Sequence, residues 1–219
     1  ILAINDPGFL TNDAIGFRVL ANVTPRIQSQ SDLDYLKAQE PDDENPPKKG
    51  DVRSFSLLAH AASESGAIER VGVLRMDLDG LGHTFSDGVP KLTLPVLSAL
   101  SEAFDLFIGG YLNTLAHKIG GNDVYIIYAG GDDLFIVGAW HRLPDLAEAI
   151  QRDFKTYTSQ HPALSISGGL TLEGAHFPLY RAAERSDAAE HVAKDYTRPN
   201  GDRKNAFCFL GTVVGWEEW

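Results

Sequence analysis

The spacing of hydrophobic positions changes along the chain, and these changes predict alternating strands and helices. Residues 71–76 (VGVLRM) and 164–172 (LSISGGLTL) are short runs of β-branched and apolar residues, which are typical of strands. Residues 94–118 and 143–160 instead carry apolar side chains at the three- and four-residue spacing of a helix. Two further runs, DVYIIYA and DLFIVGAW, flank a Gly-Gly turn and predict a hairpin.

Helices expected at 55–62 and 178–196 and a last strand at 205–211 complete the pattern. The order from residue 71 onward is then β-α-β-β-α-β-α-β, and its first part is the order of a ferredoxin-like fold. We therefore expect an α+β domain of the βαββαβ type, in which an antiparallel sheet carries helices on one face.

A polar segment divides the chain. Residues 37–51 (KAQEPDDENPPKKGD) are rich in charge and proline and contain no apolar residue other than alanine and proline. Such a composition does not support a packed element and predicts a flexible linker. We expect residues 1–36, with a short apolar run at 15–23, to be the end of a preceding small module and residues 52–219 to form the main domain. Because the chain begins with Ile1, we expect it to be part of a longer protein.

Composition and charge limit the partners and the cellular compartment that we expect for this protein. The net charge of -11 makes the whole surface a poor one for binding nucleic acid, since backbone binding depends on neutralising phosphates. The single cysteine, Cys208, excludes an internal disulfide, and its apolar neighbours predict a buried thiol in a reducing compartment. No apolar run reaches the roughly 18 residues that span a bilayer. We therefore expect a cytoplasmic protein without a membrane partner.

Two acidic clusters follow predicted strands. Asp77 and Asp79 lie at the end of the first strand (MDLDG), and Asp132 and Asp133 lie at the hairpin tip (GGDD). In a βαββ sheet the first strand lies beside the hairpin, so the clusters can converge although about 50 residues separate them. Carboxylate oxygens suit Mg²⁺, and two such ions can clamp the attacking and leaving oxygens of a phosphoryl transfer. Either cluster alone is typical of a solvated turn, but the two together favour a metal site.

The glycines beside these acids have a physical role in such a site. Gly130 and Gly131 lack a Cβ, so a nucleotide can approach their backbone and meet exposed N–H groups. Successive strand side chains face opposite ways, so Asp132 and Asp133 reach one ion only if the turn twists them. Which of the two binds metal stays open from sequence.

These motifs resemble a known family. MDLDGLG at 76–82 and YAGGDDLFIVGAW at 128–140 resemble the palm domain shared by nucleic-acid polymerases, class III nucleotide cyclases and GGDEF diguanylate cyclases. More narrowly, the chain resembles the large palm-domain (GGDD) subunit of type III CRISPR effector complexes, of the Csm (type III-A) kind. LSISGGL, AAEHVAK and KNAFCFLGTVVGW match further segments of that family in order, so the resemblance covers about residues 52 to 216.

The resemblance implies a nucleotidyltransferase that converts ATP to cyclic oligoadenylates when a guide RNA in the complex pairs with a target RNA. Its implied partners are these RNAs, a second palm and the other subunits of a prokaryotic, cytoplasmic complex. The resemblance implies that three carboxylates bind Mg²⁺ or Mn²⁺ and act in catalysis. It also implies that four further positions contact the metal or ATP. The carboxylates are Asp77, Asp132 and Asp133, and the further positions are the Leu78 carbonyl, Gly130, Gly131 and Lys194.

Some features depart from the related families and leave alternatives open. The motif reads GGDDL rather than GGDEF, and Phe85 falls near the asparagine that reads guanine in diguanylate cyclases. A non-catalytic assembly or nucleotide-sensing module and a diguanylate-cyclase-like enzyme remain as alternatives. We expect His83 to have a surface or packing role, with approach to the site as the alternative. Asp187 and Glu190 are expected on an exposed helix face.

Overall fold

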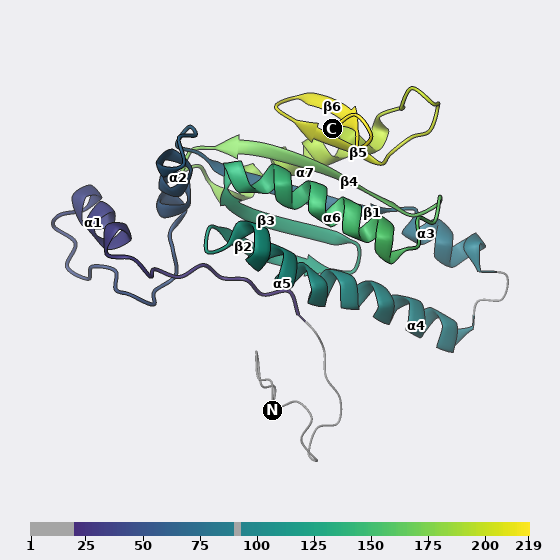
Figure 1. Ribbon diagram of the computed structural model, residues 1–219, viewed down its shortest axis with the longest axis horizontal. Coiled ribbons are helices and arrows are strands. Elements are labelled where there is room, and N and C mark those ends of the chain that lie inside the picture. Colours follow the sequence, from purple (N-terminus) through teal and green to yellow (C-terminus); the bar gives the residue numbers. More distant parts are fainter. Residues whose placement is uncertain (1–19, 90–92) are drawn as a thin grey trace, which may run out of the picture.

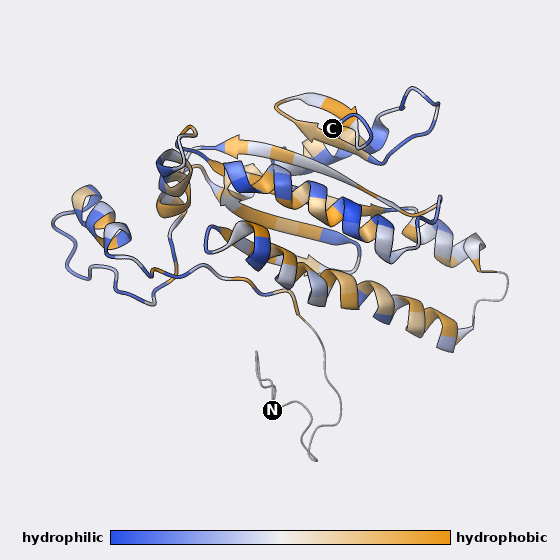
Figure 2. Ribbon diagram, viewed as in Figure 1, coloured by the Kyte–Doolittle hydropathy of each residue, from blue (hydrophilic) through white to orange (hydrophobic). Residues whose placement is uncertain are grey.

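The computed structural model describes residues 20–89 and 93–219, in which a six-stranded sheet lies between two layers of helices (Figure 1). Most of the apolar run at 15–23 therefore lies outside the described residues, and residues 20–23 contain no strand. Figure 2 shows hydrophobic residues concentrated in the central strands and in α4, whereas the loop after α1 is mostly hydrophilic.

The strand order in the sheet is β2-β3-β1-β4-β5-β6. All neighbouring strands are antiparallel except β4 and β5, which are parallel. The βαββαβ prediction is confirmed, and β6 is an additional edge strand that was not expected from the sequence. The strands are β1 (Val71–Asp79), β2 (Val124–Gly130), β3 (Asp133–Ala139), β4 (Ser165–Glu173), β5 (Ala206–Phe209) and β6 (Thr212–Gly215).

The helix predicted over residues 94–118 forms one continuous helical segment that includes two π-helical stretches. Gly109 and Gly110 lie in the first of these, at Leu106–Tyr111, and the second is at Ala116–Gly120. The helices are α1 (Gln30–Gln39), α2 (Phe55–Glu64), α3 (Leu81–His83), α4 (Leu94–Asp105), α5 (Leu112–Leu115), α6 (Leu143–Tyr157) and α7 (Leu179–Asp195).

Helices cover both faces of the sheet, so the expectation of helices on one face alone is wrong. Alternate residues of β1 point to opposite faces. Leu74 and Met76 belong to the main core, with the side chains of α4, α5 and α6. Val71 and Val73 belong to a second cluster, with residues of α2 and α7. Coverage on both faces explains why β1 is buried along most of its length rather than at every second residue.

The segment before residue 55 is joined to the sheet by a buried arginine. Arg53 is 6% exposed and donates hydrogen bonds to Asp32 of α1, to Asp123 and to the carbonyl oxygen of Asn122. Helix α1 continues to Gln39, so it includes the first three residues of the linker expected at 37–51.

Replacing Arg53 with methionine should lower the free energy of unfolding by about 3–5 kcal/mol, because it leaves the buried carboxylate of Asp32 without its cation. Urea denaturation of the purified chain measures this change. The matched control is Arg70→Met, which removes an exposed guanidinium that donates to the backbone of its neighbour. Equal stability of the two variants would contradict a structural role for the Arg53 ion pairs.

The structure bears on membrane insertion and on the state of the single cysteine. In the described ranges no helix is both long enough and apolar enough to cross a lipid bilayer. Cys208 is buried, as the sequence predicts, and burial raises the pKa of its thiol.

Candidate metal and nucleotide site

The two acidic clusters converge because β1 and β3 are antiparallel neighbours. Asp77, near the end of β1, lies directly opposite Asp133, the first residue of β3. Both positions alternate with core residues and therefore share the face of the sheet that α7 covers. The sheet thus brings together two carboxylates that are 56 positions apart in the sequence.

The hairpin tip is a two-residue turn that holds Asp132. Its first residue, Gly131, has a φ of +67°, which is the backbone conformation that a type II′ turn requires at that place. The N–H of Leu78 donates to the carbonyl oxygen of Asp132 (2.9 Å), so the backbone of β1 is tied to the turn. The Leu78 side chain itself is buried in the core. Asp132 remains exposed beside the two facing aspartates.

Helix α7 approaches the sheet closely enough to contribute Lys194 to the cluster. A Cβ on Gly169 of β4 would lie 2.4 Å from the backbone nitrogen of Glu190, a distance that only glycine permits. Across this contact, Lys194 Nζ lies 2.6 Å from Asp77 Oδ1 and 2.8 Å from Glu190 Oε1. The lysine expected to contact the triphosphate therefore pairs with two carboxylates in this structure.

Arg75, like Lys194, pairs with one carboxylate of the sheet and one of α7. One guanidinium nitrogen of Arg75 lies 2.8 Å from Asp133 Oδ2, and another lies 3.4 Å from Asp187 Oδ1 of α7. Arg75 is not among the site residues expected from the sequence, although it precedes Asp77 by two positions and so faces the same side of the strand.

The expectation of an exposed helix face at Asp187 and Glu190 is wrong for Glu190, which is 2% exposed. Asp187 is more open, but it faces the sheet and pairs with Arg75. The four-residue spacing of Glu190 and Lys194 was the signal available in the sequence, because such residues are neighbours on a helix.

The electrostatics of the cluster reflect an excess of carboxylates. Burial raises the pKa of Asp77 to about 6, with Lys194 opposing the rise and Glu190 and Asp132 adding to it. Burial also raises the pKa of Asp133, where Arg75 opposes the rise and Asp132 adds to it. Burial would lower the pKa of Lys194, but its hydrogen bonds to Asp77 and Glu190 outweigh that effect and raise it.

The residues present fit a divalent cation. Asp77, Asp132, Asp133, Asp187 and Glu190 are five carboxylates whose permanent cationic partners are Arg75 and Lys194. The Oδ1 atom of Asp133 is buried and has no hydrogen-bond partner. Oxygen donors with uncompensated negative charge are what Mg²⁺ or Mn²⁺ prefers.

In the metal-free protein, ionisation of Asp77 should lower the free energy of unfolding. Because its pKa in the folded chain (about 6) is above the ordinary 3.8, folding favours the protonated form. The cost is present above pH 6 and is relieved as the pH falls toward 4. Asp77→Asn should therefore gain up to about 2–3 kcal/mol of stability over the natural chain at pH 7.5 and almost none at pH 4. Urea denaturation in EDTA at both pH values measures the difference, and a pH-independent difference would contradict the raised pKa.

Asp79 belongs to the first acidic cluster in sequence but not to the site. Its Oδ2 atom accepts hydrogen bonds from the hydroxyls of Ser165 and Ser167 and from the N–H of Asn205. Asp79 is 3% exposed and joins β1 to β4 and to the start of β5. Its hydrogen bonds indicate a structural role.

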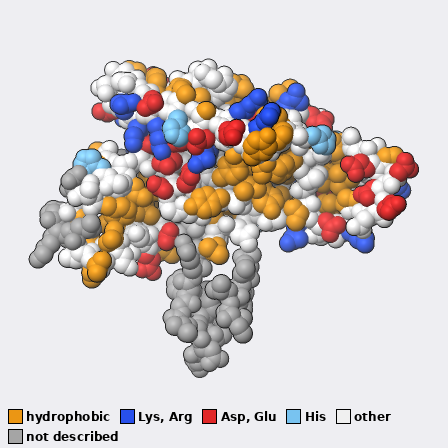
Figure 3. Space-filling view, turned by 180° about the vertical axis from the view of Figure 1, so that it is seen from behind, with side chains coloured by type: hydrophobic (Ala, Val, Ile, Leu, Met, Phe, Trp, Pro, Cys, Tyr) orange, Lys and Arg blue, Asp and Glu red, His pale blue; other side chains and the backbone are white. Residues whose placement is uncertain are grey.

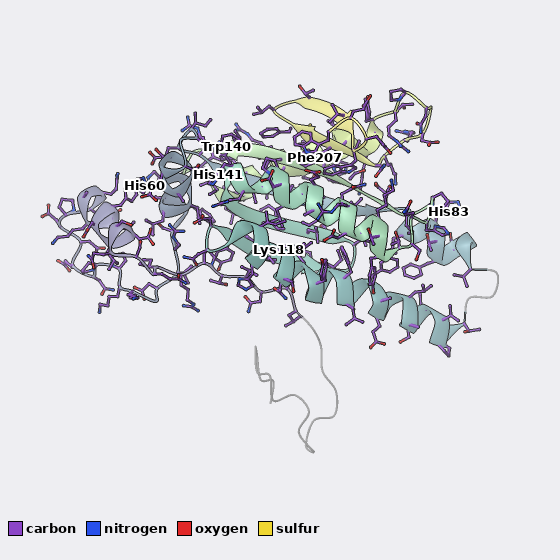
Figure 4. All side chains as sticks on the ribbon, in the orientation of Figure 1. His60, His83, Lys118, Trp140, His141 and Phe207 are labelled. Atoms are coloured by element: carbon purple, nitrogen blue, oxygen red, sulfur yellow. The ribbon has the colours of Figure 1, made fainter. Side chains whose placement is uncertain are left out.

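The histidines are spread over the molecule. His83 lies on α3, at the opposite end of the long axis from His60 and His141 (Figure 4). In the part of the chain that the structure describes, His191 is the one histidine grouped with two carboxylates, those of Asp187 and Glu190. On the face that carries α7, acidic and basic side chains intermingle beside a hydrophobic surface (Figure 3).

Comparisons with known proteins agree with the expected family. The family model described as Cas10/Cmr2, second palm domain, matches residues 70–208. A protein of Methanocaldococcus jannaschii named CRISPR system single-strand-specific deoxyribonuclease Cas10/Csm1 (subtype III-A) is 30% identical over 184 residues. A protein of the same name from Thermococcus onnurineus is 34% identical over 167 residues. These matches cover 76% and 68% of the chain, but only 23% and 20% of the two relatives.

Solved structures with the same fold have been determined with nucleotides. A Csm1-Csm4 cassette in complex with AMPPNP matches with a TM-score of 0.72 and 25% identity over 97% of this chain and 29% of that one. The cassette in complex with one ATP matches with a TM-score of 0.69 and 26% identity, covering 91% and 27% of the two chains. The cassette in complex with cA3 matches with a TM-score of 0.70, 25% identity and the same coverage. The resemblance to the type III-A palm subunit is confirmed: the chain belongs to the Cas10/Cmr2 family and carries its second palm domain.

Proposed function

We propose that this palm is a metal-dependent nucleotidyltransferase that converts ATP to cyclic oligoadenylates within an RNA-guided type III-A CRISPR complex. The observation that carries the proposal is the pairing of Asp77 with Asp133 across β1 and β3, with Asp132 at the adjoining turn and Lys194 reaching Asp77 from α7. ATP in a matching cassette and cA3 in another support the choice of nucleotide and product.

The site residues expected from the sequence have distinct roles in this reaction. Asp77 and Asp133 hold Mg²⁺ or Mn²⁺ from opposite strands, and Asp132 adds a carboxylate from the turn. When bound, the ion neutralises phosphate charge and lowers the pKa of the attacking 3′-hydroxyl. Lys194 binds the triphosphate as a point charge. The backbone at Gly130 and Gly131 lies next to the phosphates, and the Leu78 carbonyl is a further candidate ligand.

The partners follow from the proposed complex. Csm4 accompanies Csm1 in the matching cassettes, and a subunit of that kind is a proposed partner of this chain. Guide RNA, target RNA and a further palm domain, other than the one in this chain, complete the proposed assembly. The net charge of -11 favours RNA contact through other subunits rather than through this surface.

The test uses the purified effector complex with guide and target RNA, incubated with ATP or GTP and with Mg²⁺, Mn²⁺ or EDTA. We expect cyclic oligoadenylates from ATP, only with a divalent ion and only with target RNA. Turnover of GTP by an isolated homodimer would instead support a diguanylate-cyclase-like enzyme. An intact complex that binds ATP but makes no product would support a non-catalytic sensing module.

A further inference from the structure

We propose that Glu190 is a positioning residue that keeps Lys194 in the site when a metal ion takes Asp77 away from it. The inference rests on the proposed function and adds a residue that has no part in the roles described above. It starts from the double contact of Lys194, whose Nζ lies 2.6 Å from Asp77 Oδ1 and 2.8 Å from Glu190 Oε1.

The first contact is incompatible with a metal ion on the same oxygen of Asp77. Two like charges a few ångströms apart repel each other by several kcal/mol even at the effective dielectric of a protein surface. An ion on Asp77 Oδ1 would meet the Lys194 ammonium at that distance. Lys194 and the metal therefore compete for this carboxylate, and Lys194 must leave it when the ion binds.

The second contact persists. Glu190 is 2% exposed, and a buried carboxylate needs a compensating charge. Its partners among the described residues are Lys194 and His191, and His191 is a mostly exposed imidazole, charged only when protonated. Asp187, one turn earlier on α7, adds negative charge on that side and also approaches His191. Lys194 is therefore the cation that Glu190 keeps, with or without metal.

Glu190 thus sets where the ammonium goes. A lysine has a flexible four-carbon stem and three donors. Held beside Glu190 by the attraction of opposite charges, the ammonium released by Asp77 stays next to the carboxylate cluster and can donate hydrogen bonds to phosphate oxygens. Without the Glu190 carboxylate, Asp77 is the strongest remaining partner of Lys194. Lys194 then competes more effectively with the metal ion for the Asp77 carboxylate.

The test compares Glu190→Gln with Glu184→Gln, which removes an exposed carboxylate from the same helix. Mn²⁺ binding to the intact complex without nucleotide is measured by electron paramagnetic resonance. ATP kinetics are measured separately. For Glu190→Gln we expect Mn²⁺ affinity to fall about tenfold and KM for ATP to rise about tenfold, with kcat changed less. Glu184→Gln should match the natural complex, and Glu190→Asp should give an intermediate result.

A second pair of variants separates positioning from a loss of structure. Lys194→Met should bind Mn²⁺ more tightly than the natural complex, because the competing ammonium is gone. Adding Glu190→Gln to Lys194→Met should then cause no further loss of Mn²⁺ affinity. A Glu190→Gln complex with natural Mn²⁺ and ATP behaviour would overturn the inference, as would an equal loss in the Lys194→Met background. A natural complex that binds no Mn²⁺ at this cluster would instead refute the proposed function.

Discussion

Changing both Asp132 and Asp133 to alanine is expected to lower the rate of cyclic oligoadenylate formation by about a thousandfold or more. The double change removes the carboxylate opposite Asp77 and the one at the adjoining turn. A bound ion contributes several kcal/mol of charge stabilisation, and each 1.4 kcal/mol corresponds to a factor of ten in rate. The measurement is the initial rate of product formation from ATP by the complete complex with target RNA.

The chain contains a matched control for this change. Asp42 and Asp43 are another adjacent pair of aspartates, exposed on the loop after α1. Their double replacement by alanine removes the same side chains and the same charge and should leave the rate unchanged. Equal rates for the two double variants would show that the GGDD carboxylates are not the metal ligands.

Gly169→Val is expected to have a large effect from outside the carboxylate cluster. A side chain at this position would meet the backbone of α7, where the nearest atom to its Cβ is the nitrogen of Glu190 at 2.4 Å. The helix would have to move away from β4, which should lower the free energy of unfolding by about 2–3 kcal/mol. The same movement withdraws Lys194 from Asp77, so KM for ATP should rise about tenfold.

Gly174→Val, at the residue after the end of β4, is the control. A Cβ there has no neighbour within 4 Å, so the substitution should change neither urea denaturation nor KM. If Gly169→Val is as stable as Gly174→Val and keeps the natural KM, then the close contact between α7 and β4 does not hold Lys194 in place.

Local patterns predicted the elements of the sheet well because each pattern has a direct physical cause. The β-branched run at 71–76 marks β1, and the Gly-Gly turn marks the hairpin of β2 and β3. The meeting of Asp77 with Asp133 followed from strand order, since in the βαββ arrangement β1 lies beside the hairpin. Contacts between residues on neighbouring strands were therefore predictable from the sequence.

Contacts between layers were not predictable from one sequence. Helix α7 was expected, but its place on the opposite face from α6 follows from tertiary packing at Gly169. Without that placement Glu190 appears as an exposed helical glutamate, and Arg75 appears as a charge within a strand. Asp79 belongs to the first acidic cluster of the sequence, but its carboxylate instead accepts hydrogen bonds from Ser165 and Ser167 of β4 and from Asn205, just before β5.

The most direct test of the metal site is to locate the ion. A crystal of the chain with its Csm4-type partner, soaked in Mn²⁺ and ATP, would be measured at a wavelength where manganese scatters anomalously. The account predicts an anomalous peak within coordination distance of both Asp77 and Asp133, with ATP phosphate oxygens on its other side. A peak elsewhere, or bound ATP without a peak at these carboxylates, would contradict it.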